Sequence, residues 1–358
     1  MMRLRHSIGK KHALAAAVLL AFTAVSAQIV PASSGSEEAF TEADSSTIQS
    51  EGSGSHKQTS TTEADTSFVP SSRSPEASPE GLYHENKWNY VEDSMDISGG
   101  IPEDVFGRLA KIRERGVLRV VTDPYFAPQE FIDPDLSGQD QYVGADMKLA
   151  RLIADRMGVD LEIIPMDFTL VLSSMSTGEY DLAISALSYT PGRASSMELS
   201  RGYYYSPVGS GAGLMIREED LDAIRSIDDL SGKNLAVQRG SLQELMVAQN
   251  VTDYRKFRRL SSMQDVYEEV MSGRADAAGV DIESAKMYIE NNPDCGLAIL
   301  DGVEFLLDDQ FQGDRITGPK DDLELMYFVN GVINEVLDSG QYLEWFEEAS
   351  DRAAELGL

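Results

Sequence analysis

Arg193 is the residue of this chain whose type and position suggest a specific binding chemistry. It follows an apolar run over 180–187 by six residues, on a turn shaped by Pro191 and Gly192. A guanidinium offers a carboxylate a planar, bidentate fork of charge-assisted hydrogen bonds, which a lysine does not reproduce. The alternative is an exposed loop arginine without a ligand, and on its own the sequence favours that reading.

Asp281 and Ser241 stand at comparable places, each at the point where a strand-like run gives way to a helix. A carboxylate at position 281 can accept hydrogen bonds from an ammonium group, and it can also cap the helix that begins at Ile282. Ser241 starts a capping box with Glu244, while the unpaired N–H groups of a helix start also bind anions. For Ser241 the sequence leaves both readings open.

Histidine and cysteine usage excludes several classes of active site. Residues 85–358 contain no histidine, which excludes a Ser-His-Asp or Cys-His centre in the folded region and argues against a zinc or transition-metal site. The single cysteine, Cys295, has no partner for an intrachain disulfide. We therefore expect no metal and no cofactor.

The charge balance is strongly acidic, with 60 acidic and 30 basic residues among 358 and a formal net charge of −30. Such a field argues against nucleic acid or an anionic membrane as the main partner. A ligand that carries a carboxylate needs specific cationic or backbone N–H groups to bind against it.

The first residues have the pattern of an exported protein. Basic residues at positions 3, 5, 10 and 11 precede an apolar, Ala-rich run of about 15 residues, too short to span a bilayer comfortably. Small residues at 25–27 complete the features of a secretory signal peptide over 1–27. An uncleaved membrane anchor is the alternative. No cysteine follows the apolar run, so the signal is not lipoprotein-like.

A long polar segment separates this signal from the folded region. Residues 33–81 are dominated by Ser, Thr, Glu, Gly and Pro, a composition that does not bury enough apolar surface to offset chain entropy. We predict a disordered spacer over 28–100. Its last part, 82–100, contains Trp88, Tyr90 and Val91, and the sequence leaves open whether this part docks on the domain.

From Ile101 onwards the chain alternates short apolar runs with amphipathic helices. Runs at 117–121, 160–165 and 180–187 read as strands, and between them Asp146 is a candidate N-cap for a helix that ends near Gly158. Strand, helix and strand in alternation predict a parallel sheet with right-handed crossovers.

The same alternation occurs a second time after a glycine-rich, extended stretch at 203–216. Runs at 234–238 and 276–280 read as strands with helices between them, so the sequence predicts two α/β units joined by a crossing strand. Ligands of open α/β sheets bind at the carboxyl ends of the strands. Those ends carry Asp123, 188–193, 238–241 and Asp281, so we expect a ligand between the two units.

At these residues the sequence resembles the family 3 extracellular solute-binding proteins, the polar amino-acid-binding components of ABC importers. The resemblance runs from about Gly116 to Trp345. Seven segments in family order carry it: 116–123 (GVLRVVTD), 126–131 (FAPQEF), 144–158 (GADMKLARLIADRMG), 167–193 (DFTLVLSSMSTGEYDLAISALSYTPGR), 199–206 (LSRGYYYS), 229–241 (DLSGKNLAVQRGS) and 273–281 (GRADAAGVD).

The resemblance implies a two-lobed clamp of the periplasmic-binding-protein type, each lobe a mostly parallel sheet flanked by helices. It implies a discontinuous first lobe, 101–206 with 308–358, and a second lobe at 207–307. It also implies an extracytoplasmic, monomeric binding protein, not an enzyme, that captures a free amino acid and docks on an ABC importer permease.

For the charged ends of the ligand, the resemblance implies that Arg193 holds the α-carboxylate. Ser188 and the carbonyl of Ala186 orient the ligand, Asp281 accepts from its α-ammonium group, and Ser241 forms part of the carboxylate site.

The resemblance also assigns residues to the ligand's side chain. Phe126 and Phe168 match aromatic walls, Gln238 stands where relatives carry a side-chain-reading group, and Asp123 can meet a polar or cationic side chain. Gln129 departs from the family pattern, in which an aromatic residue is usual, and this favours a polar ligand side chain.

Three alternatives remain at this stage. The same clamp could present its closed form to a membrane receptor as a sensor. It could act as a dehydratase on cyclic carboxylates, for which Asp123 and Glu130 are the nearby acid or base candidates. It could also bind a ligand that is not an amino acid.

Overall fold

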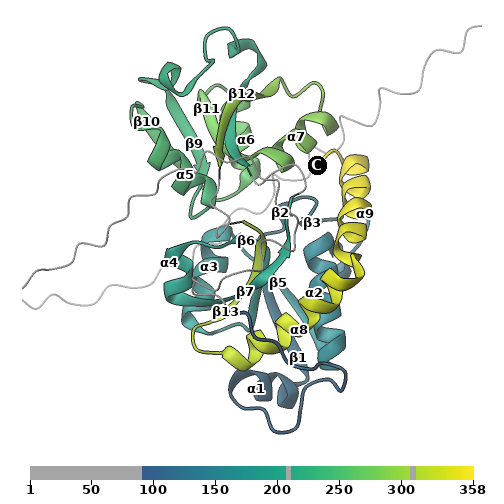
Figure 1. The fold of residues 1–358 in the computed structure, drawn as a ribbon. Helices are drawn as coiled ribbons and strands as arrows, with labels where there is room; N and C mark the ends of the chain where they lie inside the picture. Colours follow the sequence, from purple (N-terminus) through teal and green to yellow (C-terminus); the bar gives the residue numbers. More distant parts are fainter. Residues whose placement is uncertain (1–90, 207–210, 307–311) are drawn as a thin grey trace, which may run out of the picture. The chain divides into compact units, whose positions relative to one another are not determined.

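The computed structural model describes residues 91–206, 211–306 and 312–358; the predicted signal peptide and most of the predicted spacer lie outside these residues. Two five-stranded sheets with helices packed on them make up most of the described chain (Figure 1). We call the first sheet with its helices lobe 1 and the second lobe 2. None of the helices in the described ranges combines the length and apolar character that a membrane crossing requires.

Lobe 1 is built on a sheet with the order β5-β1-β6-β13-β7. Strands β5, β1 and β6 are parallel, and β13 runs antiparallel to both β6 and β7. The strands are β1 (Val117–Thr122), β5 (Asp160–Pro165), β6 (Leu182–Ser188), β7 (Met197–Tyr204) and β13 (Asp314–Pro319). The helices are α1 (Gly107–Arg115), α2 (Ala145–Met157), α3 (Phe168–Thr177), α4 (Pro191–Ser196), α8 (Leu323–Ser339) and α9 (Gln341–Leu356).

Lobe 2 repeats this plan with the order β10-β9-β11-β8-β12. Strands β10, β9 and β11 are parallel, while β8 is antiparallel to both β11 and β12. The strands are β8 (Gly211–Arg217), β9 (Asn234–Gln238), β10 (Lys256–Leu260), β11 (Ala277–Asp281) and β12 (Leu297–Leu306). The helices are α5 (Leu242–Asn250), α6 (Met263–Met271) and α7 (Ile282–Asn291), with short 3₁₀ turns at Glu218–Asp220 and Ile227–Leu230.

The predicted fold class, two mostly parallel α/β units, is therefore confirmed with one refinement. In each sheet one strand runs opposite to the others, β13 in lobe 1 and β8 in lobe 2. Each of these two strands follows a crossing between the lobes: β7 leaves lobe 1 and β8 enters lobe 2, then β12 leaves and β13 returns. The pairs of parallel strands that are hydrogen-bonded to each other come from the strand–helix–strand units.

Helix α2 shows how the apolar pattern sets the packing of lobe 1. Leu149, Ile153 and Met157 face the core, and Gly158 ends the helix in the left-handed conformation with φ of 70°. The predicted N-cap at Asp146 is wrong, because Gly144 holds that position and Asp146 is the second helical residue. Asp146 is fully buried and uses its carboxylate elsewhere.

A small three-stranded sheet follows β1 and lies outside the two large ones. Its strands are β2 (Tyr125–Phe126), β3 (Glu130–Ile132) and β4 (Tyr142–Val143), with a 3₁₀ turn at Gly138–Gln141. The peptide between Ala127 and Pro128 is cis. This hairpin follows β1 in the chain, with Phe126 at the end of β2 and Gln129 directly before β3.

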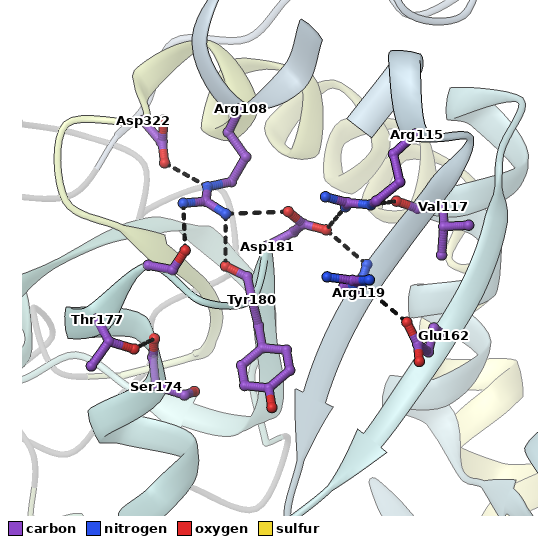
Figure 2. A network of polar contacts seen from close by, with 11 residues as sticks. Arg108, Arg115, Val117, Arg119, Glu162, Ser174, Thr177, Tyr180, Asp181 and Asp322 are labelled. Carbon is purple, nitrogen blue, oxygen red and sulfur yellow. Dashed lines mark hydrogen bonds and ion pairs between the residues drawn. The ribbon is translucent and has the colours of Figure 1, made fainter. Parts of the chain in front are cut away.

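Buried charge secures lobe 1 at the amino ends of its parallel strands. Asp181, just before β6 and 1 % exposed, accepts hydrogen bonds from the backbone N–H of Arg119 at 2.8 Å and from the guanidinium groups of Arg108 and Arg115 (Figure 2). Arg108 also donates to Asp322, before α8, at 2.7 Å. This network ties β1, β6, α1 and α8 together at the end of the sheet opposite the carboxyl ends of β1 and β6.

The segment 91–100 packs on lobe 1, although the predicted spacer extends to residue 100. Val91 is buried and donates its N–H to the carbonyl of Leu199 at 2.8 Å. The amide of Asn330 in α8 donates to the carbonyls of Val91 and Asp93, both at 2.8 Å. The apolar side chains of Val91, Met95 and Ile97 join the core of the lobe, which explains why this stretch differs from the polar residues before it.

Candidate functional site

A cavity of about 60 Å³ is lined by residues of both lobes. Its walls come from the ends of β6 and β11, the start of β13, the hairpin after β1 and the residues that flank the first crossing. The lining residues are Phe126, Gln129, Ala186, Ser188, Tyr204, Ser206, Ala212, Leu242, Gln243, Asp281, Glu283, Gly313 and Asp314.

The structure brings four of the predicted ligand residues to this cavity: Phe126, Ala186, Ser188 and Asp281. Asp281 is also the N-cap of α7, where its Oδ1 accepts from the N–H of Ser284 at 2.9 Å, so capping and facing the cavity are compatible. Burial raises the pKa of Asp281, because desolvation disfavours its charged form. The other five predicted residues do not line the cavity: Asp123, Phe168, Arg193, Gln238 and Ser241.

Arg193 lies beside the cavity and joins the two lobes. Helix α4 positions it, with the Oγ1 of Thr190 accepting from its backbone N–H at 3.1 Å. Its Nη1 donates to the carbonyl of Ser188 at 2.6 Å, and its Nη2 donates to the carbonyl of Gly240 in lobe 2 at 3.0 Å. The guanidinium carbon lies 5.5 Å from the centre of the Phe168 ring, within cation–π range.

Burial lowers the pKa of Arg193 to about 10, and Asp314 opposes this shift. The guanidinium therefore stays cationic at neutral pH. It is 7 % exposed and sits behind Ser188, which lines the cavity. A carboxylate that reached it would replace backbone carbonyls as its acceptor.

Asp123 and Gln238 form a second bridge between the lobes. The amide nitrogen of Gln238, at the end of β9, donates to Oδ2 of Asp123 at 2.9 Å, and both side chains are buried. Burial and the nearby Asp167 raise the pKa of Asp123 to about 7. The carboxylate predicted to meet a ligand side chain is thus in contact with lobe 2.

Ser241 caps α5, as the sequence pattern allows. Its Oγ accepts from the N–H of Glu244 at 3.0 Å, which is one half of the capping box, while the Glu244 carboxylate accepts from the N–H of Gly240, the residue before the N-cap, at 2.6 Å. The next two residues, Leu242 and Gln243, line the cavity instead.

Sequence reasoning missed two acidic residues of the cavity, Glu283 and Asp314. Glu283 accepts hydrogen bonds from the hydroxyl of Tyr204 at 3.0 and 3.1 Å, which links lobe 2 to lobe 1. Burial raises the pKa of Asp314 well above its usual range, with added repulsion from Asp146, Asp281 and Glu283. Glu283 stands two residues after Asp281, and Asp314 opens the return strand β13, so the only sequence signal was proximity to other site elements.

A fully buried acidic network supports the wall formed by Ala186. Asp146 accepts from the N–H of Ala186 at 3.0 Å and from the hydroxyls of Tyr203 and Tyr342 at 2.8 and 2.6 Å. Ala186 has φ of 45°, a left-handed conformation that is uncommon for a residue with a Cβ. Asp146 therefore holds a strained backbone at the cavity edge.

Glu130 lies beside this network and is 1 % exposed. Its Oε1 accepts from the hydroxyl of Ser185 at 2.8 Å, and that hydroxyl accepts from the N–H of Asp123 at 3.1 Å. Burial, and next the charge of Asp146, raise the pKa of Glu130 well above its usual range.

A further contact between the lobes involves the end of α9. The amides of Asn291 and Asn292 donate to the carbonyls of Leu358 and Gly357, at 2.7 and 2.9 Å. Met287 of α7 packs in the same apolar cluster as residues of α9 and the hairpin. Across residues 91–206, 211–306 and 312–358, no group of three or more His, Cys, Asp or Glu is placed to hold a metal ion.

Comparison with known proteins decides the family. Residues 118–348 match the family model for bacterial extracellular solute-binding proteins, family 3. The chain belongs to this family. The predicted resemblance is thereby confirmed, and with it an extracytoplasmic solute-binding protein; the signal peptide itself lies outside the described residues.

Individual relatives share much of the chain. The arginine-binding extracellular protein ArtP of Bacillus subtilis is 30 % identical over 204 residues, which is 56 % of this chain and 75 % of ArtP. An amino acid ABC transporter substrate-binding protein of Streptococcus pneumoniae, solved with L-arginine, is 30 % identical with a TM-score of 0.62 over 69 % of this chain and 98 % of its own.

One solved structure bears on the enzyme alternative. An ancestral amino acid-binding protein, a precursor of cyclohexadienyl dehydratase, is 27 % identical with a TM-score of 0.57 and covers 68 % of this chain and 99 % of its own. Binding and dehydratase chemistry thus occur on similar folds, so the site must decide between them.

Proposed function

We propose that this solute-binding protein captures a free cationic amino acid between its two lobes and delivers it to the permease of an ABC importer. The observation that carries the proposal is the acidic lining of the cavity: Asp281, Glu283 and Asp314 repel one another there, which a cation would relieve, and Arg193 lies behind Ser188. A ligand with one carboxylate and two cationic groups matches this set. The arginine-binding relatives support the same ligand class.

In the proposed complex the ligand joins the lobes through its charged ends. Its α-carboxylate lies toward Arg193 and Ser188 of lobe 1, and its α-ammonium group toward Asp281 of lobe 2. The two bodies that move are 101–206 with 308–358, and 207–307. Because the ligand contacts both lobes only when they are close, it stabilises the closed form, which the permease then recognises.

Binding is favoured over dehydratase chemistry by the position of the acid and base candidates. Asp123 is hydrogen-bonded to Gln238, and Glu130 is 1 % exposed. Neither lines the cavity. A general acid or base must reach the proton it transfers, directly or through one water.

A thermal-shift screen tests the proposed function. The purified protein is unfolded and refolded to remove bound ligand, then heated with each common amino acid. A ligand at 100 times its dissociation constant stabilises by about 2.7 kcal/mol, a shift of several degrees for a protein of this size. We expect the largest shift with L-arginine, L-lysine or L-ornithine. A folded protein that responds to no amino acid would refute the proposal.

Uptake measurements separate transport from sensing. Cells that lack the gene should lose high-affinity uptake of the radiolabelled ligand and regain it from a plasmid. Unchanged uptake, with a ligand that still binds the purified protein, would favour the sensor alternative.

A further inference from the structure

The ends of helices α7 and α9 form a contact between the lobes that lies away from the cavity. The side-chain amide of Asn291 donates to the carbonyl of Leu358 at 2.7 Å. The side-chain amide of Asn292 donates to the carbonyl of Gly357 at 2.9 Å. Asn291 is the last residue of α7 in lobe 2, while Gly357 and Leu358 follow α9 of lobe 1. We call these two hydrogen bonds the clasp; its four residues do not line the cavity.

The acceptor side of the clasp is fixed to lobe 1. Gly357 ends α9 in the left-handed conformation with φ of 72°, and the N–H of Leu358 donates to the carbonyl of Ala353 at 3.0 Å, so a closed turn holds both acceptor carbonyls. Just before this turn, Arg352 donates to both carboxylate oxygens of Asp133, each at 2.8 Å. Asp133 follows β3 and is 5 % exposed, so this bidentate pair anchors the end of α9 to the hairpin.

The donor side of the clasp belongs to the helix that faces the ligand. Asp281 is the N-cap of α7 and lines the cavity, and Glu283 in the first turn of α7 lines it too. Ten positions separate Asp281 from Asn291, which corresponds to about 15 Å along a helix. Because one helix carries both groups, holding its far end against lobe 1 keeps its first turn at the cavity.

Packing beside the clasp is incomplete, which allows the lobes to separate there. Met287 of α7 lies in one apolar cluster with Phe131 and Leu358 of lobe 1. A cavity of about 250 Å³ remains beside this cluster, lined by α6 and α7 of lobe 2 and by the hairpin and the end of α9 of lobe 1. Hydrogen bonds are lost over a short increase in distance, so the clasp exists only while the lobes are close.

We infer that Asn291 and Asn292 are positioning residues for closure, which bond lobe 2 to the end of α9 and so increase the population of the closed form. This inference rests on the proposed function, in which the ligand binds between closed lobes. The apparent dissociation constant is the intrinsic constant divided by the closed fraction, so a change in that fraction weakens every ligand by the same factor. A residue that touches the ligand changes the affinities of different ligands unequally.

The double variant Asn291→Ala with Asn292→Ala, made in the full chain, removes both donors. A hydrogen bond between neutral groups changes an equilibrium constant by about 2- to 12-fold. We therefore expect the dissociation constants of L-arginine and L-lysine, measured by calorimetry, to rise by one common factor of about five or more.

Asn250→Ala is the matched control for this variant. Asn250 is the last residue of α5 in the same lobe, and its amide donates to the carbonyl of Met246 in its own helix at 2.8 Å. The amide of Asn292 makes the same kind of bond to Tyr288 at 2.9 Å. Asn250→Ala therefore reproduces the loss within the helix but not the loss between the lobes. It should leave both dissociation constants within about twofold of the wild type.

Energy transfer between dyes on the two lobes measures closure without a ligand. Ser173→Cys on α3 of lobe 1 and Ala248→Cys on α5 of lobe 2 place the dyes at exposed positions, in a Cys295→Ser background. We expect the double variant to show lower transfer than the protein with an intact clasp. Saturating L-arginine should restore the transfer, because ligand binding drives closure.

Three results would overturn the inference: dissociation constants within twofold of the wild type, clearly different factors for L-arginine and L-lysine, or unchanged energy transfer without ligand. If the double variant does not melt cooperatively, Asn291→Ala alone takes its place and should change the same quantities in the same direction. A wild-type protein that binds no amino acid refutes the proposed function, whereas the energy transfer without ligand still decides whether the clasp holds the lobes together.

Discussion

Replacing Arg193 should reveal how much of the binding free energy depends on one guanidinium. The side chain makes two hydrogen bonds to carbonyls, at 2.6 and 3.0 Å, and is 7 % exposed. A hydrogen bond to a charged group contributes about 1.5–3 kcal/mol, so two to a ligand carboxylate contribute about 3–6 kcal/mol. Arg193→Ala should therefore weaken binding by roughly 100- to 10,000-fold, at about 1.4 kcal/mol per tenfold.

Arg193→Lys separates charge from geometry. It keeps the cation but loses the planar fork, so we expect about a 10- to 100-fold loss. Calorimetry with L-arginine as ligand measures both variants, and Arg239→Ala is the matched control, because Arg239 is exposed and next to Gly240 in the chain. Binding by Arg193→Ala within tenfold of the wild type, in a variant with a native melting curve, would refute the assignment of the carboxylate to Arg193.

Three further predictions concern stability, measured by urea denaturation. Because the pKa of Asp123 is raised to about 7, the folded state binds its proton more tightly than the unfolded state does. The contribution of this proton to the free energy of unfolding is fully present below pH 3.8 and is lost as the pH rises to about 7. Relative to Asp123→Asn, the wild type should therefore lose up to about 1.4 kcal/mol per pH unit over that window, and parallel curves would contradict this. Asp181→Asn should cost about 2–3 kcal/mol, since it disrupts charged hydrogen bonds at a carboxylate that is 1 % exposed; an unchanged midpoint would show that the network in Figure 2 contributes little. Gly144→Ala should lower the free energy of unfolding by about 3 kcal/mol or more, because the added Cβ would meet the Gln129 carbonyl. Gly232 also has a positive φ but has open space around it, so Gly232→Ala should lower that free energy by only about 1 kcal/mol. Equal costs for the two variants would contradict a clash with the Gln129 carbonyl.

The helices and strands whose residue patterns lie within a short stretch of chain could be predicted from the sequence. The runs at β5 and β9 match their predicted bounds, because β-branched and apolar residues between turn signals are local information. The N-cap predicted at Asp146 was wrong because its partners are not local. Asp is a good cap, but the carboxylate of Asp146 bonds instead to Ala186, Tyr203 and Tyr342, which come from distant parts of the chain.

The cavity could be predicted only where its residues follow the strand ends. Ser188 and Asp281 were found in this way. Glu283 and Asp314 were missed, since nothing local distinguishes them from the other acidic residues of a chain with net charge −30. Gln129 was noted as a departure from the family pattern, but its unpaired oxygen depends on packing that only the fold reveals.

The attachment of residues 91–100 also determines how mechanical load enters the protein. Val91, Asp93 and Met95 are bonded to β7 and α8, and all of these elements belong to lobe 1. A pull on the chain upstream of Val91 is therefore first borne by lobe 1. The residues that receive this load, Leu199, Tyr327 and Asn330, all belong to lobe 1.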